Sequence, residues 1–409
     1  MPFKDLDLST ELTEAITSKF KQPTKIQAQT VPIALANKDI VAIAQTGSGK
    51  TLAFGWALIE QLYQSSSARQ AVIIAPTREL ATQIHQSIKG FSDIYGLSLS
   101  LLTGGVDKES QLLELSKHPQ LIVATPGRLL DLLKGGFIQA DQIQTVVLDE
   151  ADRLLGMGFW PDIKSILSLL PTKRQTLMFS ATLPDELGSQ VSTLLTQPVV
   201  IETNSKNTVV EQIEERLYLV NKGSKVKALI HQLELNRWPQ ALVFISAKDN
   251  ADALCKKLNK AGIVAAALHG NKQQVERTQT LADFQQNKVR VLVATDVLAR
   301  GVHVDKLPVV INMELPSDPS IYVHRVGRTA RAGEEGLAIS LVCHGESDYL
   351  QAIRNLTQRT LSLKQLEGFP VTDQPSTGQS KRPKRDKQAN RRTSKKSSIK
   401  QFKTKAPQR

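Results

Sequence analysis

Short runs of aliphatic and β-branched residues recur along the first half of the chain, and stretches with a helical pattern separate them. Residues 50–63 and 78–91 are two of these helical stretches. Alternating strands and helices are typical of a mostly parallel sheet that is covered by helices on both faces. The predicted strands, each bounded by Gly, Pro or polar turn residues, are residues 41–44, 71–76, 97–104, 121–125, 145–150 and 175–182.

The same alternation begins again after a polar stretch at residues 203–208. The predicted strands of this second set are residues 241–246, 264–270, 289–295, 309–315 and 336–342. The pattern therefore predicts two α/β domains, and a chain of 409 residues is long enough for each to bury a core of its own. We expect the domains at residues 1–205 and 206–370, followed by a tail at residues 371–409.

The charge of the chain is concentrated in this tail. Residues 380–409 contain 13 of the 52 Lys and Arg residues and a single Asp, whereas the rest of the chain is nearly neutral. With almost no apolar residues the tail cannot offset chain entropy by burial, so we expect it to be disordered. Such a tail attracts polyanions, and the alternative is a solubilising tail without a specific partner.

Other features of the composition point to a cytoplasmic protein. No apolar run is long enough to span a membrane, and the acidic N-terminus does not resemble a signal peptide. Cys255 and Cys343 lie far apart without metal-ligand spacing, which fits a reducing compartment.

A glycine-rich loop, AQTGSGKT, follows the predicted strand at residues 41–44 and opens the next helix. This is the context of a phosphate-binding loop, where backbone N–H groups and a helix N-terminus face the phosphates. Lys50 would reach the β- and γ-phosphates, and the Thr51 hydroxyl would bind Mg²⁺. The alternative is a glycine-rich turn before a core helix. The residues predicted to cradle the nucleotide are Thr46, Gly47, Ser48, Gly49, Lys50 and Thr51.

Two adjacent carboxylates end the strand at residues 145–150. Asp149 is placed to hold Mg²⁺ largely through water, and Glu150 to orient or deprotonate an attacking water. Acids at strand ends also occur as simple caps. Combined with a phosphate loop, however, the pair favours hydrolysis of ATP or GTP.

The segment HRVGRTARAG, residues 324–333, gathers four cationic side chains in the second half. Arginines in such a segment can stabilise the charge of a phosphoryl-transfer transition state. The alternative is a surface patch that touches nucleic-acid phosphates, and both roles can hold for different residues.

Together these residues resemble the DEAD-box RNA helicase family, which has two RecA-like domains. The match spans roughly residues 3–345 and includes Asp149-Glu150-Ala151-Asp152. Within the resemblance, Gln27 would read the adenine edge and Phe20 would stack on the base, which implies ATP. Arg328 and Arg331 would be arginine fingers, Ser180 and Thr182 would couple hydrolysis to strand separation, and His324 and Arg325 would link the domains. The resemblance assigns RNA contacts to Pro76, Thr77, Arg78, Gly104, Gly105, Thr125, Pro126, Arg128, Gln274, Arg277, Thr295 and Asp296.

The resemblance implies a monomeric, RNA-stimulated ATPase that uses ATP and Mg²⁺, contacts the RNA backbone with weak sequence specificity and unwinds short duplexes locally. ATP and RNA would each favour a closed state, because each bridges the two domains. The alternative is an ATP-gated RNA clamp or annealing chaperone with little strand separation. A DNA helicase or another motor is disfavoured, since the motif set matches the RNA branch.

The chain departs from the family pattern most clearly at His303, where an acid that contacts the ATP ribose is usual. Three readings are open. The neutral ring accepts the same hydrogen bond, or the contact is weakened and nucleotide coupling falls, or the histidine has an acid–base role. Smaller departures are Lys19, Ala44, Asn271 and Ala330.

Overall fold

The computed structural model describes residues 2–45, 47–65, 70–203, 213–296, 307–329 and 336–374. Contacts group the chain up to Thr372 into one compact unit and set Asp373–Arg409 apart. Thr46, His303, Arg331 and nearly all of the predicted tail lie outside the described residues.

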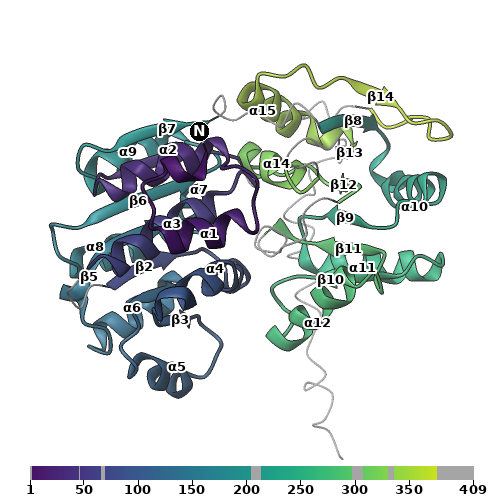
Figure 1. Ribbon diagram of the computed structural model, residues 1–409. Coiled ribbons are helices and arrows are strands. Elements are labelled where there is room, and N and C mark those ends of the chain that lie inside the picture. The colour runs from purple at the N-terminus through teal and green to yellow at the C-terminus, as the bar shows by residue number, and fades with distance from the viewer. Residues whose placement is uncertain are drawn as a thin grey trace, which may run out of the picture. The chain divides into compact units, whose positions relative to one another are not determined.

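A seven-stranded sheet forms the centre of the first half (Figure 1). All of its strand pairs are parallel, in the order β3-β4-β2-β5-β6-β1-β7. The strands are β1 (Ile40–Ile43), β2 (Gln70–Ile74), β3 (Leu99–Leu102), β4 (Leu121–Ala124), β5 (Ile143–Leu148), β6 (Gln175–Ser180) and β7 (Val199–Glu202).

Helices cover both faces of this sheet because successive residues of its buried strands point to opposite sides. On one side Ala42 and Ile73 pack into a cluster with α1 to α4, and on the other side Val41 and Ile74 pack with α6 to α9. The helices of this half are α1 (Thr10–Thr17), α2 (Lys25–Leu35), α3 (Lys50–Tyr63), α4 (Arg78–Ser92), α5 (Lys108–Leu115), α6 (Pro126–Lys134), α7 (Ala151–Gly156), α8 (Trp160–Leu169) and α9 (Asp185–Leu194), with 3-10 turns at η1 (Phe3–Asp5), η2 (Asp93–Tyr95) and η3 (Ala140–Gln142).

The second half contains another seven-stranded parallel sheet, in the order β10-β11-β9-β12-β13-β8-β14. Its strands are β8 (Ile213–Leu219), β9 (Ala241–Phe244), β10 (Ala265–Leu268), β11 (Val291–Ala294), β12 (Val309–Asn312), β13 (Gly336–Val342) and β14 (Leu363–Gln365). Its described helices are α10 (Lys225–Asn236), α11 (Lys248–Lys260), α12 (Gln274–Gln285), α14 (Pro319–Val326) and α15 (Ser347–Thr357), with 3-10 turns at η4 (Lys222–Ser224) and η5 (His344–Glu346). The predicted fold class of two parallel α/β sheets with surrounding helices is confirmed.

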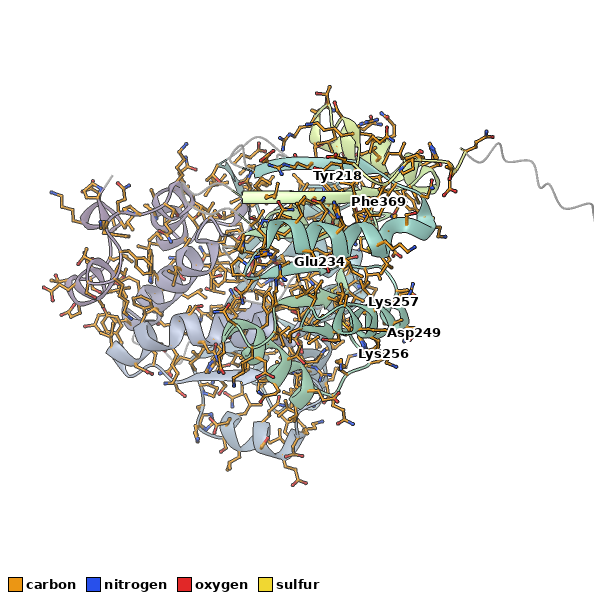
Figure 2. All side chains as sticks on the ribbon, turned by 90° about the vertical axis from the view of Figure 1, so that its right-hand side faces the viewer. Tyr218, Glu234, Asp249, Lys256, Lys257 and Phe369 are labelled. Carbon is orange, nitrogen blue, oxygen red and sulfur yellow. The ribbon has the colours of Figure 1, made fainter. Side chains whose placement is uncertain are left out.

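Helix α11 shows how these elements divide core from surface. Leu254 and Leu258 are buried against the second sheet. Asp249, Lys256 and Lys257 are exposed, and Figure 2 shows them on the face of this half that is turned to the viewer. Among the described residues, no helix has the length and apolar character needed to cross a bilayer.

A buried ion pair closes the start of α10. The Lys225 ammonium lies 2.6 Å from the Glu346 carboxylate and also donates to the Met313 carbonyl. Glu346 in turn accepts the N–H groups of Leu315 and Cys343. This carboxylate therefore acts as an internal anion at the carboxyl ends of strands β12 and β13.

Candidate functional site

The predicted phosphate loop joins β1 to α3. Gly47 and Gly49 have φ values of 80° and 95°, which L side chains rarely adopt. A Cβ on Gly49 would also lie 2.5 Å from Nε2 of Gln27, because that amide donates to the Gly49 carbonyl at 3.2 Å. The loop therefore requires glycine here both for its backbone and for the approach of Gln27.

The two residues expected to hold adenine are placed differently. Gln27 is 4% exposed, and its Oε1 accepts the Thr24 N–H at the start of α2. Phe20 is 38% exposed and contacts Trp56 edge to face. The structure thus fixes Gln27 against the loop and leaves part of the Phe20 ring accessible.

Lys50 is the first residue of α3 and is buried. Its Nζ donates to the carbonyls of Ala44 and Gln45, at 2.5 and 3.2 Å. Burial lowers the pKa of Lys50, and the nearby carboxylates of Asp149 and Glu150 oppose that shift. The cation is therefore folded over the loop, close to the predicted catalytic acids.

Asp149 and Glu150 follow β5 and are both buried, but their pKa values move in opposite directions. Burial, together with the negative charge of Glu150, raises the pKa of Asp149 to about 7. Burial alone would also raise the pKa of Glu150, but Arg153, His324 and Arg328 hold it below its usual value. Glu150 thus stays ionised near neutral pH. For Asp149, the positive charge of Lys50 does not outweigh burial and the charge of Glu150, so its pKa stays raised.

The carboxylate of Glu150 is also positioned by an ion pair. It lies 2.5 Å from the Arg153 guanidinium, and both side chains are almost fully buried. Glu150 has a φ of 49°, so the chain turns sharply between β5 and α7. Such strain at a functional position persists only where the surroundings hold it.

Asp152 connects the first half to the second. Its Oδ2 accepts the N–H and the hydroxyl of Thr182 at 3.0 and 2.7 Å, and it lies 3.1 Å from Nε2 of His324. Its backbone N–H donates to the Ser180 hydroxyl at 3.2 Å. Burial alone would raise the pKa of Asp152, but His324, Thr182 and the charge of Lys50 hold it well below its usual range.

The cationic residues in α14 and just after its C-terminus have different partners. Arg328 is buried, and its charge acts on Lys50 and Glu150. Arg325 differs from the expected domain link: it forms a bidentate pair with Asp296 and donates to Asn312 and to the Glu314 carbonyl, all in the second half. His324 alone of the two makes the contact with the first half that the resemblance implied for both.

Three arginines from three of the predicted RNA motifs lie close together. Burial lowers the pKa of Arg78, and the charges of Arg277 and Arg128 add to this effect, while Glu79 opposes it. Arg277 pairs with Glu79 at 2.9 Å. A Cβ on Gly105 would collide with the Arg78 guanidinium, so the glycine gives this side chain its space. Clustered guanidinium groups repel one another unless an anion joins them, which fits a phosphate.

The remaining predicted RNA residues lie at strand ends and helix starts. Thr77 caps α4 by accepting the Leu80 N–H, and Thr125 precedes Pro126 at the start of α6. Arg128 donates to the Val106 carbonyl at 3.1 Å. Gly104 donates to the Thr125 hydroxyl, Pro76 follows β2, Gln274 contacts Arg277 and Thr295 follows β11.

Comparisons with known proteins agree with this arrangement. A DEAD/DEAH box helicase model matches residues 24–189, and a helicase conserved C-terminal domain model matches residues 224–333. The DEAD-box ATP-dependent RNA helicase CshA of Geobacillus kaustophilus is 39% identical over 360 residues, which cover 88% of this chain and 77% of that protein. The chain belongs to the DEAD-box ATP-dependent RNA helicases.

Other members of the family are similar over comparable lengths. CshA of Bacillus subtilis is 39% identical over 379 residues, covering 92% of this helicase and 76% of that protein. Among solved structures, S. cerevisiae Dbp5 bound to RNA and ADP BeF3 has a TM-score of 0.81 at 30% identity, covering 89% of this helicase and 95% of that chain. Mss116 bound to ssRNA and UDP-BeF has a TM-score of 0.83 at 28% identity, covering 92% and 84%.

Three residues of this DEAD-box site were not predicted as site residues. Asp152 is the acceptor shared by the two halves, Arg153 holds Glu150, and Glu79 pairs with Arg277. Glu79 directly follows Arg78, and Asp152 and Arg153 stand two and three positions after Glu150, so closeness to a motif was the available signal. Their partners are far away in the chain or one helical turn on, and only the fold shows them.

The residues present fit Mg²⁺ bound together with a nucleotide. Asp149 is a buried carboxylate whose raised pKa a divalent cation would relieve, and the Thr51 hydroxyl follows Lys50 at the start of α3. Within the described ranges, no group of three or more His, Cys, Asp and Glu side chains could hold a metal by itself. Waters and substrate phosphates would therefore supply most of the ligands.

Proposed function

We propose that this helicase hydrolyses ATP with Lys50 on the phosphates, Glu150 on the attacking water, and Arg328 and Arg331 on the transition-state charge. The observation that carries this assignment is the buried Glu150 carboxylate, which Arg153 positions and which the charge of Arg328 reaches. Phosphoryl transfer needs positioning and charge stabilisation more than covalent chemistry. Mg²⁺, held by Asp149 and Thr51 largely through water, would neutralise the developing phosphate charge.

The lowered pKa of Glu150 refines its role. A carboxylate that remains ionised accepts a hydrogen bond from water well but is a weak base. We therefore assign Glu150 to orienting the water, with Arg153 fixing the carboxylate. Gln27 would fix the loop backbone through the Gly49 carbonyl. We also propose that Gln27 recognises the edge of the adenine base.

RNA would bind through the arginine cluster of Arg78, Arg128 and Arg277. Contacts of this type position a single strand by its phosphates and carry little sequence information. Because Arg277 belongs to the second half and Arg78 and Arg128 to the first, a bound strand would favour the state that brings the halves together. The Asp152–His324 contact would couple that closed state to the nucleotide site.

We also propose the domain division 1–205, 206–370 and 371–409, a monomeric state and a cytoplasmic location. The first sheet ends at Glu202 and the second begins at Ile213, which supports the first boundary. Cys255 and Cys343 are both free and buried, as expected in a reducing compartment. The basic residues 380–409 would add electrostatic attraction for RNA.

Replacing Glu150 tests the assignment directly. Glu150→Gln should lower the RNA-stimulated ATPase rate by roughly 10²–10⁴-fold, the usual range for an acid–base or orienting group. Glu314→Gln is a matched control, because Glu314 follows the equivalent strand β12 and accepts the Ser246 N–H. Hydrolysis by Glu150→Gln at the parental rate would show that the active site is assigned wrongly.

Release of a short RNA duplex separates unwinding from clamping. Unwinding predicts ATP-dependent strand release, whereas a clamp predicts ATP-dependent binding with little release. Removing residues 380–409 should weaken RNA binding at low salt most strongly, since its contribution is electrostatic. Single-stranded DNA in place of RNA should stimulate the ATPase less.

A further inference from the structure

An exposed turn follows helix α1 and carries Phe20, the residue proposed to stack on adenine. Residues 17–22 are all exposed, so burial contributes little to holding this turn in place. The N–H groups of Lys19 and Phe20 both donate to the Ile16 carbonyl, at 3.0 and 2.9 Å, and continue the last turn of α1. The side chains of these two residues reach α3 and α4, which pack with α1 on one face of the first sheet (Figure 1).

The Phe20 ring contacts a buried aromatic cluster. Trp56 of α3 is fully buried and meets Phe3 and Phe91 edge to face, with ring centroids 5.9 Å apart in both pairs. The Phe20 ring meets Trp56 at 6.0 Å and an interplanar angle of 63°. Edge-to-face contacts prefer a defined geometry, so this contact orients the Phe20 ring. Because the residue is 38% exposed, part of the ring stays accessible to a base.

Lys19 contacts the same cluster at a different ring. Its ammonium lies 4.7 Å from the centre of the Phe91 ring, within the range of a cation–π interaction. The ammonium also lies over the last turn of α4, because a Cβ on Gly90 would be 3.8 Å from Nζ. The carbonyls at the C-terminal end of a helix carry partial negative charge, which favours a cation there. Two interactions therefore hold Lys19 on α4.

The contact of Lys19 restricts its neighbour. Since Lys19 and Phe20 are adjacent in the chain, holding the lysine on Phe91 limits where the Phe20 ring can lie on Trp56. A ring that is ordered before the base arrives loses less conformational freedom on binding. Lys19 departs from the family pattern, so this hold on Phe20 does not follow from membership of the family.

We propose that Lys19 is a positioning residue for ATP: its contact with Phe91 holds the turn so that Phe20 presents its ring to the base. The inference rests on the proposed stacking of adenine on Phe20. Lys19 acts on the base through Phe20 and has no part in the transfer of the phosphoryl group. A contact that favours substrate and transition state equally lowers KM and leaves kcat unchanged.

The test measures the ATPase rate of the full chain at saturating RNA as a function of ATP concentration. Lys19→Gln removes the charge of an exposed residue and should raise the KM for ATP roughly two- to fivefold with kcat unchanged, the effect of losing one exposed cation–π interaction. Lys19→Arg should keep the KM within about twofold of the parent, because a guanidinium also stacks on aromatic faces.

A second lysine beside the same cluster is the matched control. Lys4→Gln removes an exposed cation next to Phe3, which packs on Trp56, and should leave both constants at the parental values. An unchanged KM in Lys19→Gln, or a fall in kcat without a change in KM, would overturn the inference.

A variant of Phe20 separates the inference from the function on which it rests. Phe20→Leu keeps an apolar side chain on Trp56 but removes the aromatic face, so it should raise the KM for ATP at least about fivefold. In that background Lys19→Gln should change the KM by less than about twofold, because no ring remains for Lys19 to position.

The two failures are distinguishable. If Lys19→Gln keeps its full effect on KM in the Phe20→Leu background, Lys19 acts through its own charge, and the inference fails while the stacking stands. If Phe20→Leu leaves the KM at the parental value, the stacking itself is wrong, and the inference fails with it.

Discussion

The two sheets of the molecule have the same strand order, so each strand of the first has a counterpart in the second. Strand β1 corresponds to β8, β2 to β9, β4 to β11, β5 to β12 and β6 to β13. Their carboxyl ends carry different chemistry on one side of the sheet and similar chemistry on the other. One part of the repeated fold therefore carries similar residues in both halves, and the other part carries different ones.

The similar side comprises β4 and β11. Thr125 follows β4 and Thr295 follows β11, and both belong to the predicted RNA contacts. The arginine cluster likewise draws on both halves, with Arg78 and Arg128 from the first and Arg277 from the second. Both sheets therefore present the same edge to the proposed RNA strand.

The divergent side comprises β1 with β5 and β8 with β12. Lys50 and Lys225 are each the first residue of the helix that follows the equivalent strand, and both are buried. Lys50 donates to two backbone carbonyls of its loop, whereas Lys225 pairs with the Glu346 carboxylate. In the second half an internal carboxylate thus takes the partner role that a phosphate would take in the first.

Substituting each lysine should give the largest difference between the two halves. Lys225→Ala leaves Glu346 buried without its cation and should lower the free energy of unfolding by about 3–5 kcal/mol. Lys50→Ala should change stability much less but abolish ATP binding. Urea unfolding and nucleotide titration measure the two effects, and equal destabilisation by both variants would contradict the interpretation.

Replacing the contact between the halves should have the next largest effect. His324→Ala removes one donor from Asp152 and should lower the stimulation of ATPase activity by RNA roughly 5–150-fold, the range of typical coupling energies. ATP binding without RNA should be nearly unchanged, because Thr182 still holds Asp152. If RNA stimulates the variant as strongly as the parent, the contact does not transmit coupling.

The arginine cluster gives a smaller, sharper test. Arg128→Ala should weaken RNA binding uniformly across sequences and lower the slope of log affinity against log salt by roughly one. Lys164→Ala, an exposed change in the same half, should leave the slope unchanged. A sequence-dependent loss would instead point to base recognition.

His303 should give the smallest effect. Restoring the acid that is usual in the family, His303→Asp, should raise the ATP affinity of the RNA-bound protein by no more than about tenfold, or ~1.4 kcal/mol. An ATP titration in the presence of RNA measures this change. Loss of ATPase activity would show that the histidine has an essential role of its own.

Much of the fold could be predicted because buried parallel strands read as continuous apolar runs. Helix α3 begins and ends as predicted, whereas the strands β7, β8 and β14 were not assigned. All three residues of β14 are exposed and it carries no hydrophobic signal, whereas β7 (Val-Val-Ile-Glu) is a short apolar run and β8 mixes charged and apolar residues. Backbone pairing with a neighbouring strand, which depends on the fold, defines them.

The candidate site could likewise be predicted only in part. The places of Lys50 at the start of α3 and of Asp149 directly after β5 were predictable from motif spacing, while their roles stay predictions. Arg325 was not, because its position beside His324 suggests a shared role, although the two side chains of α14 have partners in different halves. Pairings between residues far apart in the chain need the coordinates.

The carboxylate of Asp152 has a consequence for how the proposed cycle repeats. One oxygen receives two donors from Thr182 in the same half and only one from His324. When the second half departs after hydrolysis, two of the three donors remain, and the first half does not have to be rebuilt. Each reopening at this point then breaks one charge-assisted hydrogen bond, which costs about 1.5–3 kcal/mol. This free energy is small enough for frequent turnover and large enough to favour the closed state.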